Sequence, residues 1–367
     1  MKYLWQLAEW PKFHWDKARL AESLAEARHR QGLLLGQMRA LGFKLREEAS
    51  LETLTADVVK TSEIEGERLS AAQVRSSIAR RLGVDIGGLV HSDRNVEGIV
   101  EVALDATRNF DAPLTIERLF DWHASLFPTG RSGMKRISVA GWRRDATGPM
   151  EVVSGPMGKE KVHFVAPPAK RLDQEVKAFL NWFEGNNTID AVLKAGVAHL
   201  WFVTIHPFDD GNGRIARAIA DMALARSEQN SQRFYSVSSQ IGIERDSYYD
   251  ILERTQKNSL DITRWLLWFL ACFSGAISNA QQTLESVMSK ARFWEKHASQ
   301  PLNQRQIKLL NKLLDGFEGK LTTGKWANIA KCSQDTAYRD ILDLVDRGVL
   351  KRNNSRGRST SYSLAEV

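Results

Sequence analysis

The sequence predicts a mainly helical protein with one β-hairpin that stands off the helical body and a smaller unit at the C-terminal end. Three observations support this. Apolar residues recur at helical spacing along most of the 367 residues. Two short extended runs, 150–153 and 162–165, flank the segment GPMGK, and Pro167-Pro168 closes the second run. After Pro301, helical segments precede a basic hairpin, the order of elements in a winged helix-turn-helix domain.

Apolar periodicity and capping residues predict the helices in order. A charged amphipathic helix is expected over 17–42 and another over 50–66, which ends at Gly66 because glycine suits the residue after a helix C-terminus. Ser70 with Gln73 favours a capping-box start for a short helix that stops at Gly83. Further helices are expected over 93–109, 115–126, 172–184, 190–205, from near 213 to about 226, and over 246–257, 260–273 and 277–298. Segment 190–205 is apolar on nearly every face, which predicts a buried central helix.

These elements divide the chain into four expected parts. They are a helical N-terminal region over 1–90, a core over 91–275, a connecting helix over 276–300 and a winged helix over 301–367. In the last part we expect helices over 303–314, 325–330 and 334–347 and a hairpin over 349–364.

The C-terminal part is basic. It holds twelve Lys or Arg and seven Asp or Glu, within a chain of net charge +7. This indicates an acidic partner, with DNA the first candidate. The outward face of the expected recognition helix would present Gln334, Thr336, Tyr338 and Arg339, and the wing would present Lys351, Arg352, Arg356 and Arg358. Winged helices also bind proteins, so protein contact is the alternative.

Composition excludes several classes of protein. Hydrophobic content of 43% and charged content of 26% are typical of a globular protein. No apolar stretch is long enough to span a membrane, and the charged N-terminus does not resemble a signal peptide. Cys272 and Cys332 are too few for a disulfide framework and have no metal-ligand spacing. A reducing, cytoplasmic setting is expected, and a homodimer is plausible.

The segment His206-Pro207-Phe208-Asp209-Asp210-Gly211-Asn212-Gly213-Arg214-Ile215-Ala216-Arg217 carries the strongest chemical signal. The apolar helix must end at Pro207, which places His206 at the mouth of a loop. Gly211 and Gly213 let backbone N–H groups converge on an anion, and a new helix adds its positive N-terminal end. Arg214 and Arg217 share a helix face and can reach one phosphate chain. Asp210 offers an oxygen ligand for Mg²⁺, and an imidazole can take a proton from a hydroxyl.

Other interpretations of this segment are weaker. An EF-hand with Gly213 as its invariant glycine would place Phe208 and Ile219 where acidic residues are needed. The segment PMGKE lacks both ends of a Walker phosphate loop. A metal hydrolase that uses His199, His206 and the two aspartates remains an alternative. The residues between the two histidines are apolar, however, which favours His199 as a core histidine.

Residues 206–217 resemble the complete active-site motif of the Fic family, HPFx(D/E)GNGRxxR, and the similarity extends over roughly 90–275. The resemblance implies a Fic-type helical core in which the hairpin is a flap that holds the target protein. It also implies transfer of AMP from ATP to a Ser, Thr or Tyr hydroxyl of a protein, possibly the enzyme itself. In the family roles, His206 would be the base, Asp210 would hold Mg²⁺, and Gly211, Asn212, Gly213, Arg214 and Arg217 would bind the phosphates. Tyr248 and Tyr249 match the family's tyrosines near the adenine pocket, with core aromatics as the alternative.

A second motif, Thr61-Ser62-Glu63-Ile64-Glu65-Gly66, lies upstream on a helix. Leu54, Val58, Thr61 and Glu65 share one face, so Glu65 should point toward the protein, whereas Glu63 and Glu67 suit a solvated face. The segment resembles the family's inhibitory motif, (S/T)xxxE(G/N). This resemblance implies that Glu65 pairs with Arg217 and blocks transfer.

Two functions of other kinds stay open at this point. The chain could be a DNA-binding regulator whose core senses a nucleotide. It could also be an enzyme that removes AMP or transfers another phosphate-containing group, because the residues of the motif suit binding of phosphates better than binding of a particular base.

Overall fold

The computed structural model describes residues 2–86, 88–146, 148–156, 158–186, 188–314, 317, 319–353 and 360–365. Met157 of the predicted hairpin turn and Arg356 and Arg358 of the predicted wing lie outside these ranges. The chain divides into two compact units, residues 1–281 and 282–367. The described elements are mainly helices with small antiparallel hairpins, so the predicted mainly-α fold class is confirmed.

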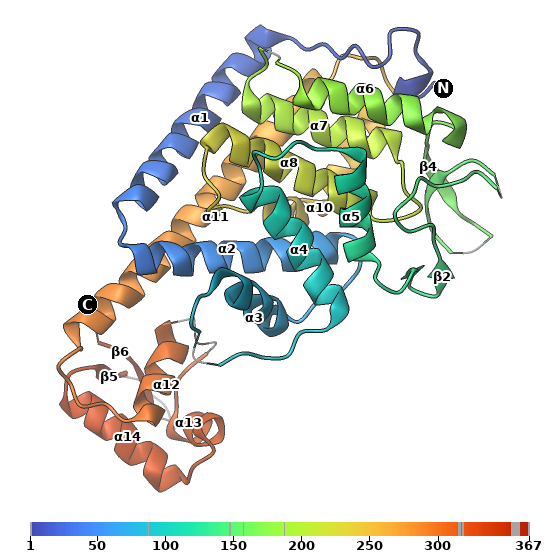
Figure 1. Ribbon diagram of the computed structural model, residues 1–367. Coiled ribbons are helices and arrows are strands. Elements are labelled where there is room, and N and C mark those ends of the chain that lie inside the picture. Colours follow the sequence, from blue (N-terminus) through green and yellow to red (C-terminus); the bar gives the residue numbers. More distant parts are fainter. Residues whose placement is uncertain are drawn as a thin grey trace. The chain divides into compact units, whose positions relative to one another are not determined.

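The first unit is built from helices around α7 (Figure 1). Its α-helices are α1 (Lys17–Ala40), α2 (Phe43–Ile64), α3 (Ala71–Leu82), α4 (Arg94–Arg108), α5 (Ile116–Leu126), α6 (Leu172–Glu184), α7 (Ala191–Ile205), α8 (Asn212–Glu228), α9 (Val237–Ile243), α10 (Arg245–Gln256) and the N-terminal part of α11 (Thr263–Lys296). Two short 3-10 helices, η1 (Leu4–Gln6) and η2 (Ala169–Arg171), precede α1 and α6.

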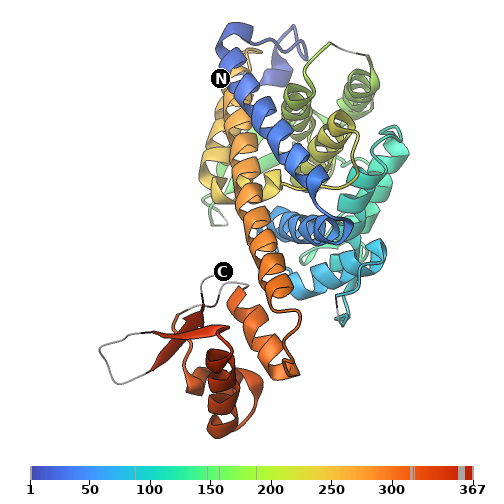
Figure 2. The same cartoon turned by 90° about the vertical axis from the view of Figure 1, so that its left-hand side faces the viewer.

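Helix α7 is the central helix that its apolar sequence predicts. All but two of its residues are buried, and it packs against α6 and α8. Helix α8 is also mostly buried and contacts α4 and α5 on another side. Helix α1 runs beside the start of α11, where Arg30 Nη1 donates to Ser278 Oγ at 2.9 Å (Figure 2). The loop between α7 and α8 is therefore held by two helices with little freedom to move.

Two antiparallel hairpins precede α6. Strands β3 (Glu151–Ser154) and β4 (Lys161–Val165) pair with Val152 opposite Phe164, and the register shifts between Val152 and Val153. This is the hairpin that the extended runs predict. A smaller hairpin, β1 (Arg131–Ser132) with β2 (Lys135–Arg136), was not predicted, because two-residue strands leave no periodic signal.

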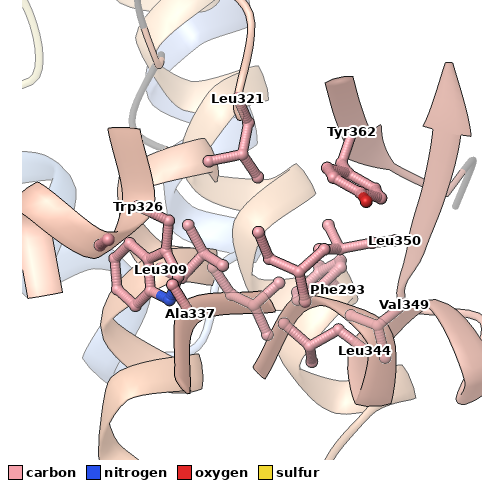
Figure 3. Packing of buried hydrophobic residues seen from close by; sticks show 12 residues of the cluster. Phe293, Leu309, Leu321, Trp326, Ala337, Leu344, Val349, Leu350 and Tyr362 are labelled. Carbon is pink, nitrogen blue, oxygen red and sulfur yellow. The ribbon is translucent and has the colours of Figure 1, made fainter. Parts of the chain in front are cut away.

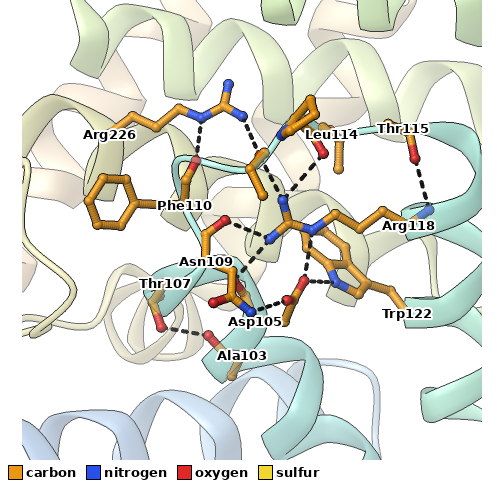
Figure 4. Close-up of polar contacts among 12 residues, drawn as sticks. Ala103, Asp105, Thr107, Asn109, Phe110, Leu114, Thr115, Arg118, Trp122 and Arg226 are labelled. Atoms are coloured by element: carbon orange, nitrogen blue, oxygen red, sulfur yellow. Dashed lines mark hydrogen bonds and ion pairs between the residues drawn. The ribbon is translucent and has the colours of Figure 1, made fainter.

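The connection from α4 to α5 is held by two arginines, Arg118 and Arg226; Arg226 Nε donates to Phe110 O at 2.7 Å (Figure 4). Arg118 Nε donates to Asp105 Oδ2 at 2.7 Å, and its Nη atoms donate to backbone carbonyls of Asp105, Asn109 and Ala112. Asp105 also accepts from Trp122 Nε1 at 2.7 Å. Arg118 thus satisfies the carbonyls at the end of α4, which fixes the angle at which α5 enters.

Helix boundaries differ from the prediction in three places. Helix α2 begins at Phe43, well before the predicted start, and the short α9 was not predicted. The segments 260–273 and 277–298 form one helix, α11, rather than two. Gly275 lies inside this helix at a place where a neighbouring side chain comes close: a Cβ there would lie 2.8 Å from Gln240 Cδ.

The second unit has its own hydrophobic core, formed by twelve buried residues that include Phe293, Leu309, Trp326, Ile341 and Tyr362 (Figure 3). Helices α12 (Gln304–Leu314), α13 (Thr323–Ala330) and α14 (Gln334–Asp346) precede the strands β5 (Leu350–Asn353) and β6 (Ser361–Leu364). Ser333 caps α14 by accepting from Thr336 N at 3.1 Å. This element order is the one that the sequence predicts for a winged helix.

Within the described residues, no helix is long and apolar enough to cross a membrane.

Candidate active site

The loop between α7 and α8 has a strained and well-braced backbone. His206 ends α7 with φ of 50°, a left-handed conformation that costs a non-glycine residue about 1 kcal/mol or more. Gly211 has φ of 82° and precedes α8. Asn212 closes the loop, since its side-chain Oδ1 accepts from Phe208 N at 3.0 Å and its Nδ2 donates to Phe208 O at 2.9 Å. The Asn212 side chain thus ties the start of α8 to the backbone of Phe208 and fixes the shape of the loop.

His206 has the protonation state that a general base needs. Its Nδ1 lies 3.2 Å from the carbonyl oxygen of Val203, so Nδ1 carries the hydrogen and Nε2 is the free acceptor. Burial lowers the pKa of His206 from its ordinary value to about 4, so the imidazole is neutral at pH 7. The ring can accept a proton from a hydroxyl placed at Nε2.

Arg143, which the sequence analysis did not single out, holds this loop and the base of the hairpin together. Its Nε donates to His206 O at 2.7 Å, and its backbone N donates to Pro207 O at 3.0 Å. Its Nη2 donates to Pro167 O at 2.5 Å, immediately after β4. The guanidinium is fully buried and paired with Asp145 at 2.7 Å. No local pattern distinguishes such an arginine from a surface one, because its backbone-carbonyl partners at His206, Pro207 and Pro167 are distant in sequence.

The N-terminus of α8 points its backbone N–H groups and two arginines in one direction. Its N-cap, Gly211, provides no side-chain cap, so the first N–H groups of the helix stay available to an anion. Arg214 and Arg217 are 7% and 3% exposed. Arg214 Nε and Arg217 Nη1 are buried, and neither atom has a hydrogen-bond partner among the described residues. Two buried guanidiniums with unused donors suit a phosphate chain.

Asp210 lies beside these groups. Its Oδ1 accepts from Gly211 N at 2.6 Å, and its Oδ2 accepts a short hydrogen bond from Ser132 Oγ on β1. The neighbouring Asp209 accepts from Ser138 N at 2.8 Å. Across the described part of the chain no three His, Cys, Asp or Glu residues gather as metal ligands. One carboxylate beside a phosphate site still fits Mg²⁺, which takes one or two protein carboxylates and completes its shell with phosphate oxygens and water.

The end of α2 reaches Arg217 directly. Arg217 Nε donates to Thr61 Oγ1 at 2.7 Å, and Nη2 donates to Thr61 O at 2.9 Å and to Glu65 Oε1 at 2.7 Å. Gly66 has φ of 85°, and the N–H groups of Gly66 and Glu67 bond to Glu63 O and Ser62 O at 3.0 Å. This is a Schellman end, the glycine termination that the sequence predicts. The structure therefore brings Thr61, Glu65 and Arg217 together.

Glu65 also occupies the space in front of α8. A Cβ built on Gly213 would lie 2.1 Å from Glu65 Oε1, so the carboxylate sits against the backbone of the second residue of that helix. The side chain of Glu65 is 27% exposed, more open than the sequence predicts. Glu67 suits a solvated face better than Glu65 does, and 38% of its side chain is exposed; even so, its Oε2 accepts from Arg214 Nη1 at 2.8 Å. Glu63 is also exposed and pairs with Lys60 on its own helix at 2.6 Å, as a solvated face would.

The two tyrosines have different surroundings. Tyr248 is 2% exposed and its hydroxyl lies 3.0 Å from His199 Nε2. His199 is itself buried, and burial lowers its pKa to about 3, as expected for a core histidine rather than a ligand on a shared face. Tyr249 is half-buried, and its hydroxyl donates to Ile64 O at 3.3 Å, next to Glu65. A role of either tyrosine at an adenine ring stays a prediction.

Two N-terminal tryptophans tie the start of the chain to the hairpin and to α6. Trp5 Nε1 donates to Val165 O at 2.7 Å, at the end of β4, and Trp10 Nε1 donates to Glu175 Oε2 at 2.8 Å on α6. His163 on β4 also pairs with Glu253 on α10 at 2.5 Å. The hairpin is thus fixed at its base from two sides. The sequence shows the tryptophans but not what they contact.

Comparison with known proteins gives two family matches. Residues 113–224 match the Fic/DOC family, and residues 3–84 match a domain of unknown function, DUF4172. A probable protein adenylyltransferase of Aquifex aeolicus is 36% identical over 64 residues, which are 17% of this chain and 20% of that protein. A uridine 5'-monophosphate transferase of Xanthomonas campestris is 30% identical over 122 residues, 31% of this chain and 22% of that protein. The matches thus span about a fifth of the length of these curated relatives.

Among solved structures, the fold resembles a Fic family protein from Desulfovibrio desulfuricans. The TM-score is 0.56 at 20% identity, and the alignment covers 96% of this chain and 97% of that one. At this identity the likeness concerns the fold alone. The complete 206–217 motif lies inside the matched range, on the loop and helix described above. Residues 113–224 of this chain are therefore a Fic domain, a member of the Fic/DOC family.

Proposed function

We propose that this protein transfers AMP from Mg·ATP to a Ser, Thr or Tyr hydroxyl of a protein and that Glu65 holds it inactive. The relatives named adenylyltransferase and uridine monophosphate transferase support nucleotidyl transfer as the class of reaction. The observation that carries the proposal is the neutral His206 beside an uncapped helix N-terminus and two buried arginines with unused donors.

The chemistry follows from these groups. The acceptor hydroxyl oxygen attacks the α-phosphorus, the bond from that phosphorus to the β-phosphate's bridging oxygen breaks, and pyrophosphate leaves. His206 Nε2 takes the hydroxyl proton. Arg214 and Arg217 bind the β- and γ-phosphates, and the N–H groups of α8 contact the phosphate chain. Asp210 would hold Mg²⁺, which neutralises part of the phosphate charge.

Glu65 accounts for the inhibited state because it occupies the place where a phosphate would bind. Glu65 uses the Nη2 donor of Arg217 and lies against Gly213, where a phosphate would be received. A nucleotide can then bind only with its γ-phosphate displaced, and the α-phosphate is not aligned with the acceptor. The hairpin β3–β4, anchored by Trp5 and Arg143, would hold the target segment by strand pairing.

The test is incubation of the full chain with Mg²⁺ and ATP labelled at the α-phosphate, followed by intact mass measurement. Glu65→Gly should gain an AMP adduct or label an added acceptor protein, and Glu65→Gly with His206→Ala should not. UTP in place of ATP distinguishes the two transfers for which the relatives are named. Glu65→Gly that labels nothing with either nucleotide would refute the proposal.

For residues 301–367 we propose a separate role in binding DNA. Tyr338 and Arg339 are exposed on α14, and Lys351 and Arg352 are exposed on β5. These side chains suit contacts to a phosphate backbone. A nucleotide-sensing regulator would retain DNA in every Glu65 variant and show no transfer, which separates it from the enzyme.

A further inference from the structure

Glu67 makes a second ion pair across the same site. Its Oε2 lies 2.8 Å from Arg214 Nη1. The Arg214 guanidinium also lies over the Phe127 ring, with its central carbon 4.9 Å from the ring centre, and its Nε is buried without a partner among the described residues. Arg214 is thus held between an aromatic face and a carboxylate, with one donor still unused.

The turn at Gly66 explains how two carboxylates reach one helix. In a continuing helix, residues two apart point about 200° apart and would not face the same neighbour. The left-handed Gly66, φ 85°, ends α2 between them and redirects the chain. Glu65 then meets Arg217 and Glu67 meets Arg214, three residues earlier on the same face of α8. Each carboxylate occupies one arginine.

We infer that Glu67 is a second inhibitory residue, which withholds Arg214 from the nucleotide while Glu65 withholds Arg217. The inference rests on the proposed function, in which these arginines bind the β- and γ-phosphates. Two carboxylates then stand in the places of two phosphates. Removing Glu65 alone leaves Arg214 engaged, so release by Glu65→Gly is incomplete.

Nucleotides that differ in their number of phosphates can distinguish the Glu67–Arg214 pair from the Glu65–Arg217 pair. AMP reaches neither arginine, ADP reaches Arg214, and ATP reaches both. Glu67→Ala frees Arg214 and should strengthen ADP binding roughly three- to tenfold, as expected for an ion pair between a buried guanidinium and a partly exposed carboxylate, and leave AMP binding unchanged. Alanine is chosen because a glutamine carbonyl could still accept the hydrogen bond of Arg214.

The experiment is calorimetric titration of the full chain with AMP, ADP and ATP in Mg²⁺. Glu63→Ala is the matched control, because it removes the same charge at a similar exposure from the same helix end, and Glu63 pairs with Lys60 on its own helix. The backbone N–H of Glu67 that closes α2 is retained in Glu67→Ala. The melting temperature should therefore fall no further than in Glu63→Ala.

The expected result is a gain in ADP affinity for Glu67→Ala only, and a higher transfer rate for Glu65→Gly with Glu67→Ala than for Glu65→Gly alone. ADP affinities that are equal in wild type, Glu67→Ala and Glu63→Ala would overturn the inference and leave the proposed function intact. An equal gain in AMP affinity would also overturn it, because the effect would then be general charge removal. Absence of nucleotide binding in every variant would overturn the proposed function, and the inference with it.

Discussion

Replacement of Glu65 by glycine tests the inhibited state most directly. Arg217 makes three hydrogen bonds to the end of α2, two to Thr61 and one to Glu65. A charge-assisted bond of this kind contributes about 1.5–3 kcal/mol, and the 27% exposure of the Glu65 side chain favours the lower end. About 1.5 kcal/mol corresponds to roughly a tenfold larger population of free Arg217.

The rate should rise by more than this factor, because Glu65→Gly also clears the carboxylate from the backbone of Gly213. We expect at least a tenfold gain in the initial rate of AMP incorporation, measured with labelled ATP at saturation. Nucleotide affinity should change less than the rate, because in the proposed inhibited state ATP still binds, with its γ-phosphate displaced.

The double variant distinguishes a pairwise contact from a loosened helix. Glu65→Gly with Arg217→Ala removes the residue that the first change releases, so most of the gain should disappear. A double variant as active as Glu65→Gly would mean that the change acts by freeing α2. An unchanged rate in Glu65→Gly itself would remove Glu65 from the mechanism.

Four further outcomes are expected. His206→Ala should lower kcat/KM roughly 10²–10⁴-fold with ATP affinity nearly intact in calorimetry. Because burial lowers the pKa of His206 to about 4, the acid limb of kcat/KM for ATP in Glu65→Gly should lie near pH 4; a limb near 6.5 would contradict this. The free energy of unfolding should also decrease toward acid pH, because the stabilising contribution of neutral His206 is lost as pH falls from 6.5 through 4. Trp5→Phe loses the bond to Val165 O and should raise KM for an acceptor protein but not for ATP. Binding of duplex DNA should fall steeply with salt and vanish without residues 301–367; salt-independent retention would argue for protein contact.

The fold could be predicted where a segment carries its own signal. Helix α7 is apolar on every face, Gly66 and Gly83 end helices with positive φ, and Ser70 and Ser333 cap the helices that follow them. These features depend on neighbours within a few residues. The two-residue strands β1 and β2 and the continuity of α11 depend instead on packing against distant residues.

The candidate site also has residues that the sequence could predict and residues that it could not. Within residues 206–217 the base, the carboxylate, the glycines and the arginines are close in sequence, and the loop keeps them close in space. The resemblance also connected Glu65 with Arg217, across 152 positions. Arg143 and Ser132 carried no signal, because an arginine or a serine in a loop has no pattern that names its partner.

The sequence by itself determined the chemistry of the site, since chemistry follows from residue types at fixed local spacing: an imidazole, a carboxylate, and two arginines at the start of one helix. Only the tertiary structure decided which charges are engaged. Glu67 suited a solvated face better than Glu65, and its side chain is the more exposed of the two, but nothing in the sequence showed its pairing with Arg214, to which the chain is directed by the left-handed Gly66. Periodicity describes a face only while the helix continues, and beyond its last turn the partner of a charge depends on which element packs there.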